Sequence, residues 1–394
     1  MYLILVPPIL GTLAVEFDTS IALVGLAIGV GGATNMLFQL PFGYFTDNYD
    51  WTIGYVLALL FGSLGVFVSA LAPSYGVFVV GQAVLGIGVA GHHPSHYPLL
   101  SDATPLEQRG RAFSARGFAG HLGFGAPPVV ITGLVQFPGV TWRHALGLIG
   151  GVGVAYLLVS YYVFSEHVGA DVKFPESREN RLASVRERVR EELKVLLTSP
   201  AILALTLLAL VTSLFSWGVT TYTIVHLTEN YGFGNDVANL ALTTMFGLGA
   251  VMILVGGHLT DTLSTGRILV ASYVGVFVFV GLFAWTALPA YVALGCIVVV
   301  GAIRGVSGPP RSKLADDVSK RGSLGKNFAM ISVGLMAGNA LGPPLFGAVV
   351  DLAGVQNAFW AITLTAALAL LITVSIVLRF SDELSAPSID AADD

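Results

Sequence analysis

Charged residues are scarce in this chain of 394 residues, because Asp, Glu, Lys and Arg together make up only 11% of it. Soluble domains carry about 25% charged residues, which cover the surface that faces water. Hydrophobic residues make up 55% of this chain instead. The composition excludes a soluble globular protein and predicts an integral membrane protein.

Two further absences exclude other classes. Cys296 is the only cysteine, so the chain cannot form an internal disulfide. The glycine-rich loop followed by Lys and Ser or Thr, which cradles the phosphates of ATP, does not occur in the sequence. We expect no ATP hydrolysis by this chain, no cofactor and no nucleic-acid partner.

Long apolar segments fill the chain. A helix needs about 20 apolar residues to cross about 30 Å of hydrocarbon. Eleven segments of this kind follow one another, at approximately 21–42, 53–72, 76–99, 112–135, 144–164, 201–226, 237–258, 267–287, 290–310, 327–350 and 357–379. They predict eleven full transmembrane helices.

Polar motifs recur at a nearly constant offset along the chain. Three pairs lie 214 to 216 residues apart: Pro94-x4-Leu99-x2-Asp102 with Pro309-x4-Leu314-x2-Asp317, Gly43-x3-Asp47 with Gly257-x3-Asp261, and Pro127-Pro128 with Pro343-Pro344. Duplicated loop motifs in a membrane protein indicate two packed bundles with a pathway between them. The duplication therefore predicts a transporter.

The segment Met1–Leu10 is apolar but too short to cross a membrane. The duplication places the counterpart of the span near Pro200 ahead of Met1, so we expect the first of twelve helices to be incomplete. A signal peptide is the alternative, but no basic segment and no small-residue cleavage site precede Glu16.

The predicted fold class is an all-α integral membrane protein with two pseudo-symmetric six-helix bundles. The first bundle occupies 1–164 and the second 200–380, with a polar linker at 165–199 and an acidic, disordered tail at 381–394. Leu182, Val185, Val189, Leu193 and Leu196 fall at helical spacing in the linker. They predict an amphipathic helix, which either lies on the inner leaflet or is solvated.

The basic residues predict the orientation of the chain. Of the 19 Lys and Arg residues, only Arg143 lies in a loop on the far side, and Arg304 lies within a span. The others gather on one face, which the positive-inside rule assigns to the cytoplasm. We expect a multi-pass protein of the cell membrane, with both termini cytoplasmic.

These motifs resemble the major facilitator superfamily over essentially the whole chain. The loop between helices 2 and 3 of that family, Gly-x3-Asp followed by basic residues, is matched by Gly257-His-Leu-Thr-Asp261 with Gly266-Arg267. Its first copy, Gly43-Tyr-Phe-Thr-Asp47, departs from the pattern because no basic residue follows.

Two further stretches are similar to exporters of drugs or small metabolites within that family. They are Gly86 to Pro94 followed by Gly110-Arg111, and Gly120-His-Leu-Gly123-Phe-Gly-Ala-Pro127-Pro128. Two positions depart from the exporters: Pro127 stands where glycine is usual, and Gln82 stands near the position of an arginine. The resemblance implies alternating access, with bending at Pro127, Pro128, Pro343 and Pro344.

The resemblance also implies a switchable latch at the cytoplasmic face. Asp47 would meet the helix that begins near Lys326, and Asp261 would meet the one that carries Arg111 and Arg116. Gly43, Gly257 and Arg267 complete these motifs. A carboxylate is stabilised by the free amides of a helix N-terminus. A simple role as solvated loop aspartates is the alternative.

Arg304 lies about 14 residues into its span, roughly 20 Å deep at 1.5 Å per residue. A charge at this depth normally faces a cavity or a partner, and no carboxylate occurs at similar depth in the full spans. An anionic substrate would supply the partner. Alternatively, the side chain extends toward the inner interface.

Four histidines lie in or near the spans: His92, His93 and His96 in one cluster, and His121 in the next span. His92 and His96 have the spacing of a metal pair, but Pro94 lies between them and no acidic ligand is close. We therefore expect no metal ion. A role in the substrate pathway or as proton carriers suits side chains that titrate near neutral pH, and simple packing is the alternative.

Other polar residues of the predicted substrate pathway are Asn35, Gln39, Gln82, Trp217, Thr221, Tyr222 and Asn339. Each is alternatively a hydrogen-bonding contact between helices.

We predict a monomeric secondary transporter of small organic solutes, not an enzyme, that exports its substrate in exchange for an ion such as H⁺. The alternatives are an importer of an anionic metabolite anchored by Arg304, and a non-transporting membrane sensor.

Overall fold

The computed structural model describes residues 2–105, 108–167, 200–319 and 324–379, without some side chains, among them those of Asp47 and Lys326. Nearly all of the predicted linker, including its amphipathic helix, and the tail at 381–394 therefore lie outside the described residues. Every regular element in the described ranges is helical. This confirms the predicted all-α fold class.

Eleven of the described helices are long and apolar enough to cross a membrane, as predicted. They are α2 (Ile21–Asn48), α3 (Trp51–Ala70), α4 (Tyr75–Asp102), α5 (Arg109–Val135), α6 (Trp142–His167), α9 (Pro200–Tyr231), α10 (Asn235–Thr262), α11 (Thr265–Ala284), α12 (Ala290–Ser319), α13 (Leu324–Ala353) and α14 (Val355–Arg379). Before them, the chain forms two short 3₁₀ turns and helix α1 (Leu10–Glu16).

Local sequence signals begin these helices. The Ser20 hydroxyl accepts a hydrogen bond of 3.2 Å from the Leu23 amide and caps α2. The Asp50 carboxylate accepts bonds of 2.6 Å from both the amide and the hydroxyl of Thr52 and caps α3. Helices suit the bilayer because they satisfy their backbone polar groups internally, and only the terminal groups need such partners.

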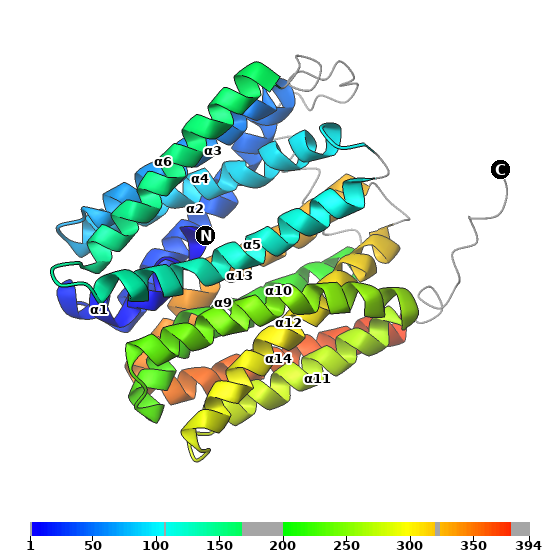
Figure 1. The fold of residues 1–394 in the computed structure, drawn as a ribbon. Helices are drawn as coiled ribbons and strands as arrows, with labels where there is room; N and C mark the ends of the chain where they lie inside the picture. The colour runs from blue at the N-terminus through cyan, green and yellow to red at the C-terminus, as the bar shows by residue number, and fades with distance from the viewer. Residues whose placement is uncertain (1, 106–107, 168–199, 320–323, 380–394) are drawn as a thin grey trace.

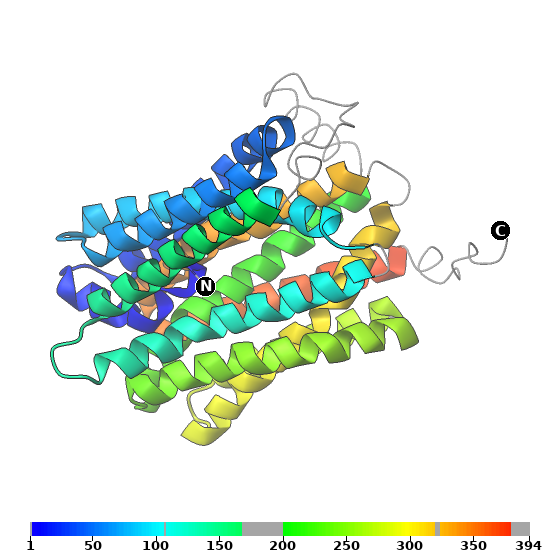
Figure 2. The ribbon, with the colours of Figure 1, turned by 45° about the horizontal axis from the view of Figure 1, so that its top comes forward.

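The helices form two layered groups that meet along two seams (Figures 1 and 2). In Figure 1, α3, α4 and α6 lie at the top, α10, α11, α12 and α14 at the bottom, and α5 and α13 between them. Helix α2 packs along α13, and α5 packs along α10. The duplication relates α2 to α10 and α5 to α13, so the two seams are pseudo-symmetric counterparts.

Glycines bring α2 and α13 into backbone contact. A Cβ atom added at Gly29 would lie 2.6 Å from the Ala340 carbonyl oxygen, and one at Gly32 would lie 2.8 Å from the Ala340 Cα. At Gly25 an added Cβ would collide with the Tyr222 hydroxyl and with the Pro343 backbone. Small residues at helical spacing let membrane helices approach closely, and this is the tighter of the two seams.

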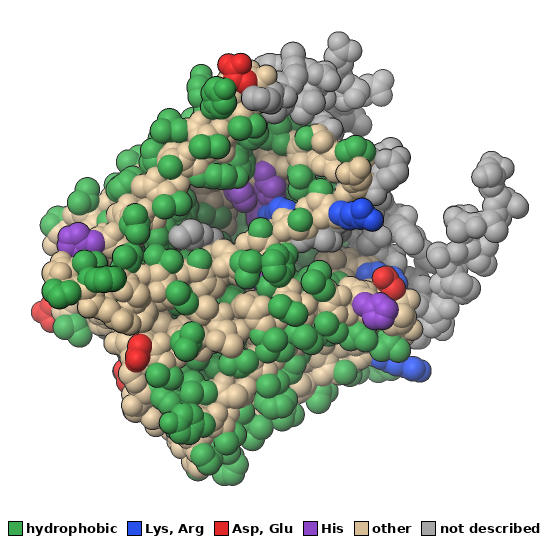
Figure 3. Space-filling view, in the orientation of Figure 1, with side chains coloured by type: hydrophobic (Ala, Val, Ile, Leu, Met, Phe, Trp, Pro, Cys, Tyr) green, Lys and Arg blue, Asp and Glu red, His purple; other side chains and the backbone are tan. Residues whose placement is uncertain are grey.

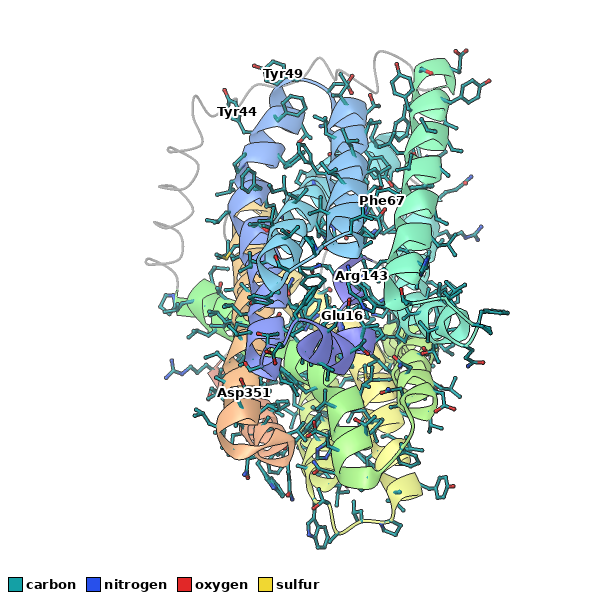
Figure 4. The ribbon with its side chains drawn as sticks, turned by 90° about the vertical axis from the view of Figure 1, so that its left-hand side faces the viewer. Glu16, Tyr44, Tyr49, Phe67, Arg143 and Asp351 are labelled. Carbon is teal, nitrogen blue, oxygen red and sulfur yellow. The ribbon has the colours of Figure 1, made fainter. Side chains whose placement is uncertain are left out.

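We call the end of the bundle that carries Arg111, Arg267 and Arg379 the basic end, and the other end the opposite end. The contacts between α2 and α13 described above lie in the half near the opposite end. There the Ala22 amide, at the start of α2, donates to both carboxylate oxygens of Asp351 at 3.2 Å. Asp351, at the end of α13, thus ties the two groups together (Figure 4).

Arg143, the expected exception to the positive-inside pattern, lies at the opposite end. Its guanidinium forms a 2.7 Å ion pair with Glu16 and donates to the carbonyls of Ala70 and Ala72 at 3.0 and 2.8 Å. The Trp142 indole also donates to Glu16. Figure 4 shows Glu16 and Arg143 adjacent. The arginine joins α1, the end of α3 and the start of α6, so its position has a structural cause.

Candidate functional site in the central cavity

A cavity of about 440 Å³ lies between α5, α9, α10 and α12. Its lining begins near Ile4 and Thr220 and extends along α12 to Ser312, close to the basic end. This volume falls within the range of pockets that hold small molecules. The cavity is therefore the candidate substrate site.

Cationic side chains line this cavity. Arg304 and Arg311 both face it from α12, and His121 faces it from α5. Seven residues are close to two helical turns, so the two arginines lie on one face of α12, about 10 Å apart along its axis. The two guanidinium groups and the His121 ring therefore share one cavity.

Carboxylates lie far from the middle of this cavity. In the described helices every Asp and Glu occurs within the first or last few residues, as Glu229, Asp261 and Asp351 illustrate. Among the described side chains, the single ion pair joins Arg143 to Glu16 at the opposite end. Arg304 therefore has no acidic partner among the described side chains.

Aromatic side chains form the apolar walls. Phe124 of α5 and Phe246 of α10 meet with ring centroids 5.8 Å apart. Phe215 and Trp217 of α9 complete the lining on another side, with hydroxyls from Ser216 and Thr220 beside them. Flat apolar surfaces next to a few polar groups are typical of sites for small organic molecules.

The tyrosine at the α11 side of the cavity lies beside the second arginine. The Tyr273 side chain is buried, and it lines the cavity together with Arg311. Arg311 lies nearer the basic end of the cavity than Arg304 does.

A second polar cluster lies in the half of α4 near the basic end. The His92 and His96 rings stack with centroids 4.3 Å apart, and His93 lies 5.7 Å from both. The Arg116 guanidinium of α5 donates to the Tyr97 hydroxyl at 2.8 Å and lies 3.3 Å from His93 Nδ1. We call these five side chains the histidine cluster.

Figure 3 shows histidine and basic side chains together in a hollow on the face drawn there. Within the described residues, no group of three or more His, Cys, Asp or Glu side chains has an arrangement that would hold a metal ion. His96 Nδ1 instead lies 2.6 Å from the His92 carbonyl oxygen.

Of the predicted pathway residues, His121, Trp217 and Arg304 meet at the cavity. Gln82 lies elsewhere, because its amide donates to the Ser69 hydroxyl at 3.0 Å in the contact between α3 and α4. The Tyr222 hydroxyl donates to the Pro343 carbonyl across the bundle.

The remaining predicted pathway residues are buried or partly buried in helix contacts. Asn35, Thr221 and Asn339 are buried, and Gln39 is partly buried. The Oε1 of Gln39, the hydroxyl of Thr221 and the Oδ1 of Asn339 lie out of hydrogen-bonding reach of the described side chains and backbone. None of the four lines the central cavity.

The predicted latch residues gather at the basic end. Asp47 and Asp261 lie in the last turns of α2 and α10, and Arg111 lies in the first turn of α5. Asp261, Arg111 and Arg267 are exposed. No ion pair between described side chains joins Asp261 to Arg111 or to Arg116, and the pairing of Asp47 with Lys326 lies outside the described side chains. The latch stays a prediction.

Comparison with known proteins decides the family. The sequence model of the Major Facilitator Superfamily matches residues 1–225 and 206–392, which together cover nearly the whole chain. The chain belongs to the major facilitator superfamily.

Its curated relatives within the superfamily include named exporters. The rubrofusarin-specific efflux pump aurT of Gibberella zeae is 29% identical over 147 residues, which are 36% of this chain and 26% of that protein. The inner membrane transport protein YajR of Escherichia coli is 28% identical over 163 residues, 40% of this chain and 35% of that protein. The aligned regions thus span about a third or less of these relatives.

Solved structures of superfamily members share the fold. The D-xylose-proton symporter aligns with a TM-score of 0.75 at 15% identity, over 94% of this chain and 92% of that one. An inward-facing bacterial homologue of the human lysosomal transporter Spinster aligns with a TM-score of 0.72 at 15% identity, over 98% and 95%. At this identity the likeness concerns the fold alone.

The superfamily fold brings together cavity residues that the sequence analysis missed. Arg311, Phe124, Phe215, Phe246 and Tyr273 were not predicted as site residues. The spacing of Arg311, seven residues after Arg304 on one helical face, is a signal that would have found it. The four aromatic residues carry no such signal, because apolar rings are common in every span of this chain.

Proposed function

We propose that this chain is a secondary active transporter that exports small organic solutes by alternating access, driven by a proton gradient. The observation that carries the proposal is the central cavity. Its lining reaches the basic end along α12, whereas α2 and α13 are in backbone contact toward the opposite end. A site open to one end and closed toward the other is one of the two states that alternating access requires.

The orientation follows from the charges. The basic end faces the cytoplasm, by the positive-inside rule, and the described conformation is then inward-facing. The substrate enters from the cytoplasm between the two groups of helices and is released after the opposite end opens. The named efflux pumps among the relatives support this direction.

The histidine cluster is the proposed proton carrier. Among the described residues, acidic side chains lie only near helix ends, and the partly buried histidines of α4 are side chains of the type whose ordinary pKa is closest to neutral pH. Arg116 lies 3.3 Å from His93 Nδ1, and the Tyr97 ring stacks on the His93 ring. The Tyr55 ring of α3 lies 5.5 Å from the His92 ring. Protonation of the cluster next to Arg116 adds charge of the same sign, which favours a change of its packing.

Transport in proteoliposomes tests the proposal. The purified full chain is reconstituted, a mixture of organic anions, cations and neutral solutes is added, and a pH gradient is imposed. We expect one or more solutes to accumulate on the acidic side, opposite to the proton flux, measured by mass spectrometry of the vesicle contents. Identical contents in vesicles with and without the protein would contradict the proposal.

Import of an anion is the second candidate function, and Arg304 is the observation that favours it. Both candidates use the same cavity, and they differ in the sign of the coupling between solute and proton. In the same vesicles, a symporter would accumulate the solute on the side to which protons flow. The sign of the solute gradient therefore separates export from import.

A further inference from the structure

We propose that the central cavity selects amphipathic organic anions, with a carboxylate or sulfonate bound between Arg304 and Arg311 and an apolar ring held by the aromatic walls. This inference rests on the proposed function, because it names the class of solute that the transporter carries. It does not depend on the direction of transport.

The first step of the argument is the charge of the cavity. Arg304 and Arg311 face the same space, and the described helices place no carboxylate near the middle of the bundle. Asp316 and Asp317 follow Arg304 by twelve or more residues on α12, about 18 Å or more along the axis. A guanidinium inside the membrane region is costly without a partner, so an anion that enters the cavity supplies the missing charge.

The second step is the geometry of the two cations. Arginine presents a planar set of donors that matches the two oxygens of a carboxylate or sulfonate. Arg304 and Arg311 lie about two helical turns apart on one face of α12, with Arg311 nearer the basic end. An anion arriving from the basic end thus meets Arg311 first and Arg304 at the inner end of the path.

The third step is the wall around the cations. Phe124, Phe246, Phe215 and Trp217 present apolar rings to the cavity, and Ser216 and Thr220 add hydroxyl donors. A small inorganic anion would leave these rings facing water. An anion with an aromatic or broad aliphatic body would bury them, because apolar area removed from water contributes roughly 25 cal/mol per Å².

Three matched probes test this inference: 2-naphthoate, 2-naphthylmethanol and 2-naphthylmethylammonium, which differ in charge and share one ring system. Binding of each to the purified full chain is measured by isothermal titration calorimetry. We expect 2-naphthoate to bind at least tenfold more tightly than the neutral and the cationic probe. Equal or tighter binding of either of these would overturn the inference, and so would absence of 2-naphthoate binding to the folded protein.

Variants locate the site. Arg304→Gln removes the charge and should weaken 2-naphthoate binding at least tenfold, whereas Arg304→Lys should retain most of the binding. Arg379→Gln, at the exposed end of α14, removes a matched charge outside the cavity and should change nothing. Thermal unfolding of each variant establishes that it is folded. Unchanged 2-naphthoate binding in a folded Arg304→Gln variant would refute the assignment.

The outcomes separate this inference from the proposed function. A protein that drives a neutral or cationic solute in the proteoliposome assay, and that does not bind 2-naphthoate, remains a transporter while the anion inference fails. A protein that binds 2-naphthoate through Arg304, but moves no solute under any gradient, retains the anion site while the transporter proposal fails.

Discussion

Arg143 alone joins three elements at the opposite end. The guanidinium binds one carboxylate and two backbone carbonyls at the end of α3, and both Ala70 and Ala72 are buried. Buried carbonyls that lose their donors are costly, at about 1 to 3 kcal/mol. This arginine stabilises the fold, whereas Arg304 faces the cavity.

The first prediction concerns Arg143. Arg143→Met keeps much of the side-chain volume but removes the donors to Glu16, Ala70 and Ala72. We expect the free energy of unfolding to fall by about 1 to 3 kcal/mol, measured as a lower midpoint of thermal unfolding in detergent. Arg379→Met, on an exposed helix end, is the control and should leave the midpoint unchanged. An unchanged midpoint in Arg143→Met would show that these bonds contribute nothing.

The second prediction concerns the pH dependence of Glu16. Partial burial acts to raise the pKa of its carboxyl, but hydrogen bonds from Trp142 and Arg143 and the Arg143 charge outweigh it, so the pKa lies below the ordinary 4.5. A depressed pKa in the folded state stabilises the fold above 4.5, and this contribution is lost as the pH falls through the folded value.

The measurement compares wild type with Glu16→Gln. At neutral pH the variant should unfold at a lower temperature, and the difference should shrink as the pH is lowered below 4.5. A difference that stays constant over this range would mean that the Glu16 charge does not contribute.

The third prediction concerns the histidine cluster. Replacing His92, His93 and His96 together by Gln removes the proposed proton carriers but keeps polar side chains of similar size. We expect transport driven by a pH gradient to fall at least tenfold, while exchange of solute between the two sides without a gradient continues. Loss of both activities in a folded variant would indicate a structural role, and retention of both would exclude the cluster as the carrier.

At the scale of elements, the contact between α2 and α13 determines whether the opposite end closes. Gly29 faces the Ala340 carbonyl and Pro344 at distances that leave no room for a Cβ atom. The Asp351 carboxylate accepts from the Ala22 amide in the first turn of α2 at the same end, where a carboxylate is also favoured by the helix dipole. The closed seam therefore combines backbone packing with one charged cap.

The fourth prediction is that Gly29→Val opens this seam. The added side chain would force α13 away and disfavour the described conformation relative to one open at the opposite end. Spin labels at Val15 and Leu352, both exposed at that end, should move apart in a Cys296→Ser background, measured by pulsed electron resonance. Gly76→Val, where an added Cβ meets nothing within 4 Å, is the control. An unchanged distance in Gly29→Val would contradict the proposed closure.

At the scale of the whole molecule, the sequence was sufficient for the helices and for the duplicated architecture. Apolar length alone located all eleven spans, because the bilayer sets that length. Helix ends were less predictable: α2 continues from the predicted boundary at 42 to Asn48. The prediction ended the span at the Gly43–Asp47 motif because hydropathy indicates which residues face lipid. It does not indicate where the helical backbone ends.

The cavity was predicted only in part. Most of its walls come from α5, α9, α10, α11 and α12, and the sequence does not state how each helix is rotated about its axis. Arg304 and His121 stood out because charge is rare in the spans. Phe246 and Tyr273 did not stand out, because the sequence alone does not distinguish an aromatic residue that faces a cavity from one that faces lipid. Gln82 was predicted as a pathway residue because it is polar, yet its side-chain amide donates a hydrogen bond to the Ser69 hydroxyl. A polar side chain in a span can thus bond to a neighbouring helix and not face a cavity.

The two seams differ in how much room they leave. Along α2 a single methyl group at Gly29 already collides with backbone, whereas at Gly125 on α5 an added Cβ would meet Thr243 and Phe246 at ordinary contact distances of 3.4 and 3.5 Å. In a saturation mutagenesis scan, larger residues at Gly25, Gly29 and Gly32 should therefore abolish function, whereas larger residues at Gly125 should be tolerated. Variants with altered substrate preference are then to be sought along α5, where substitutions leave the closing contact between α2 and α13 intact.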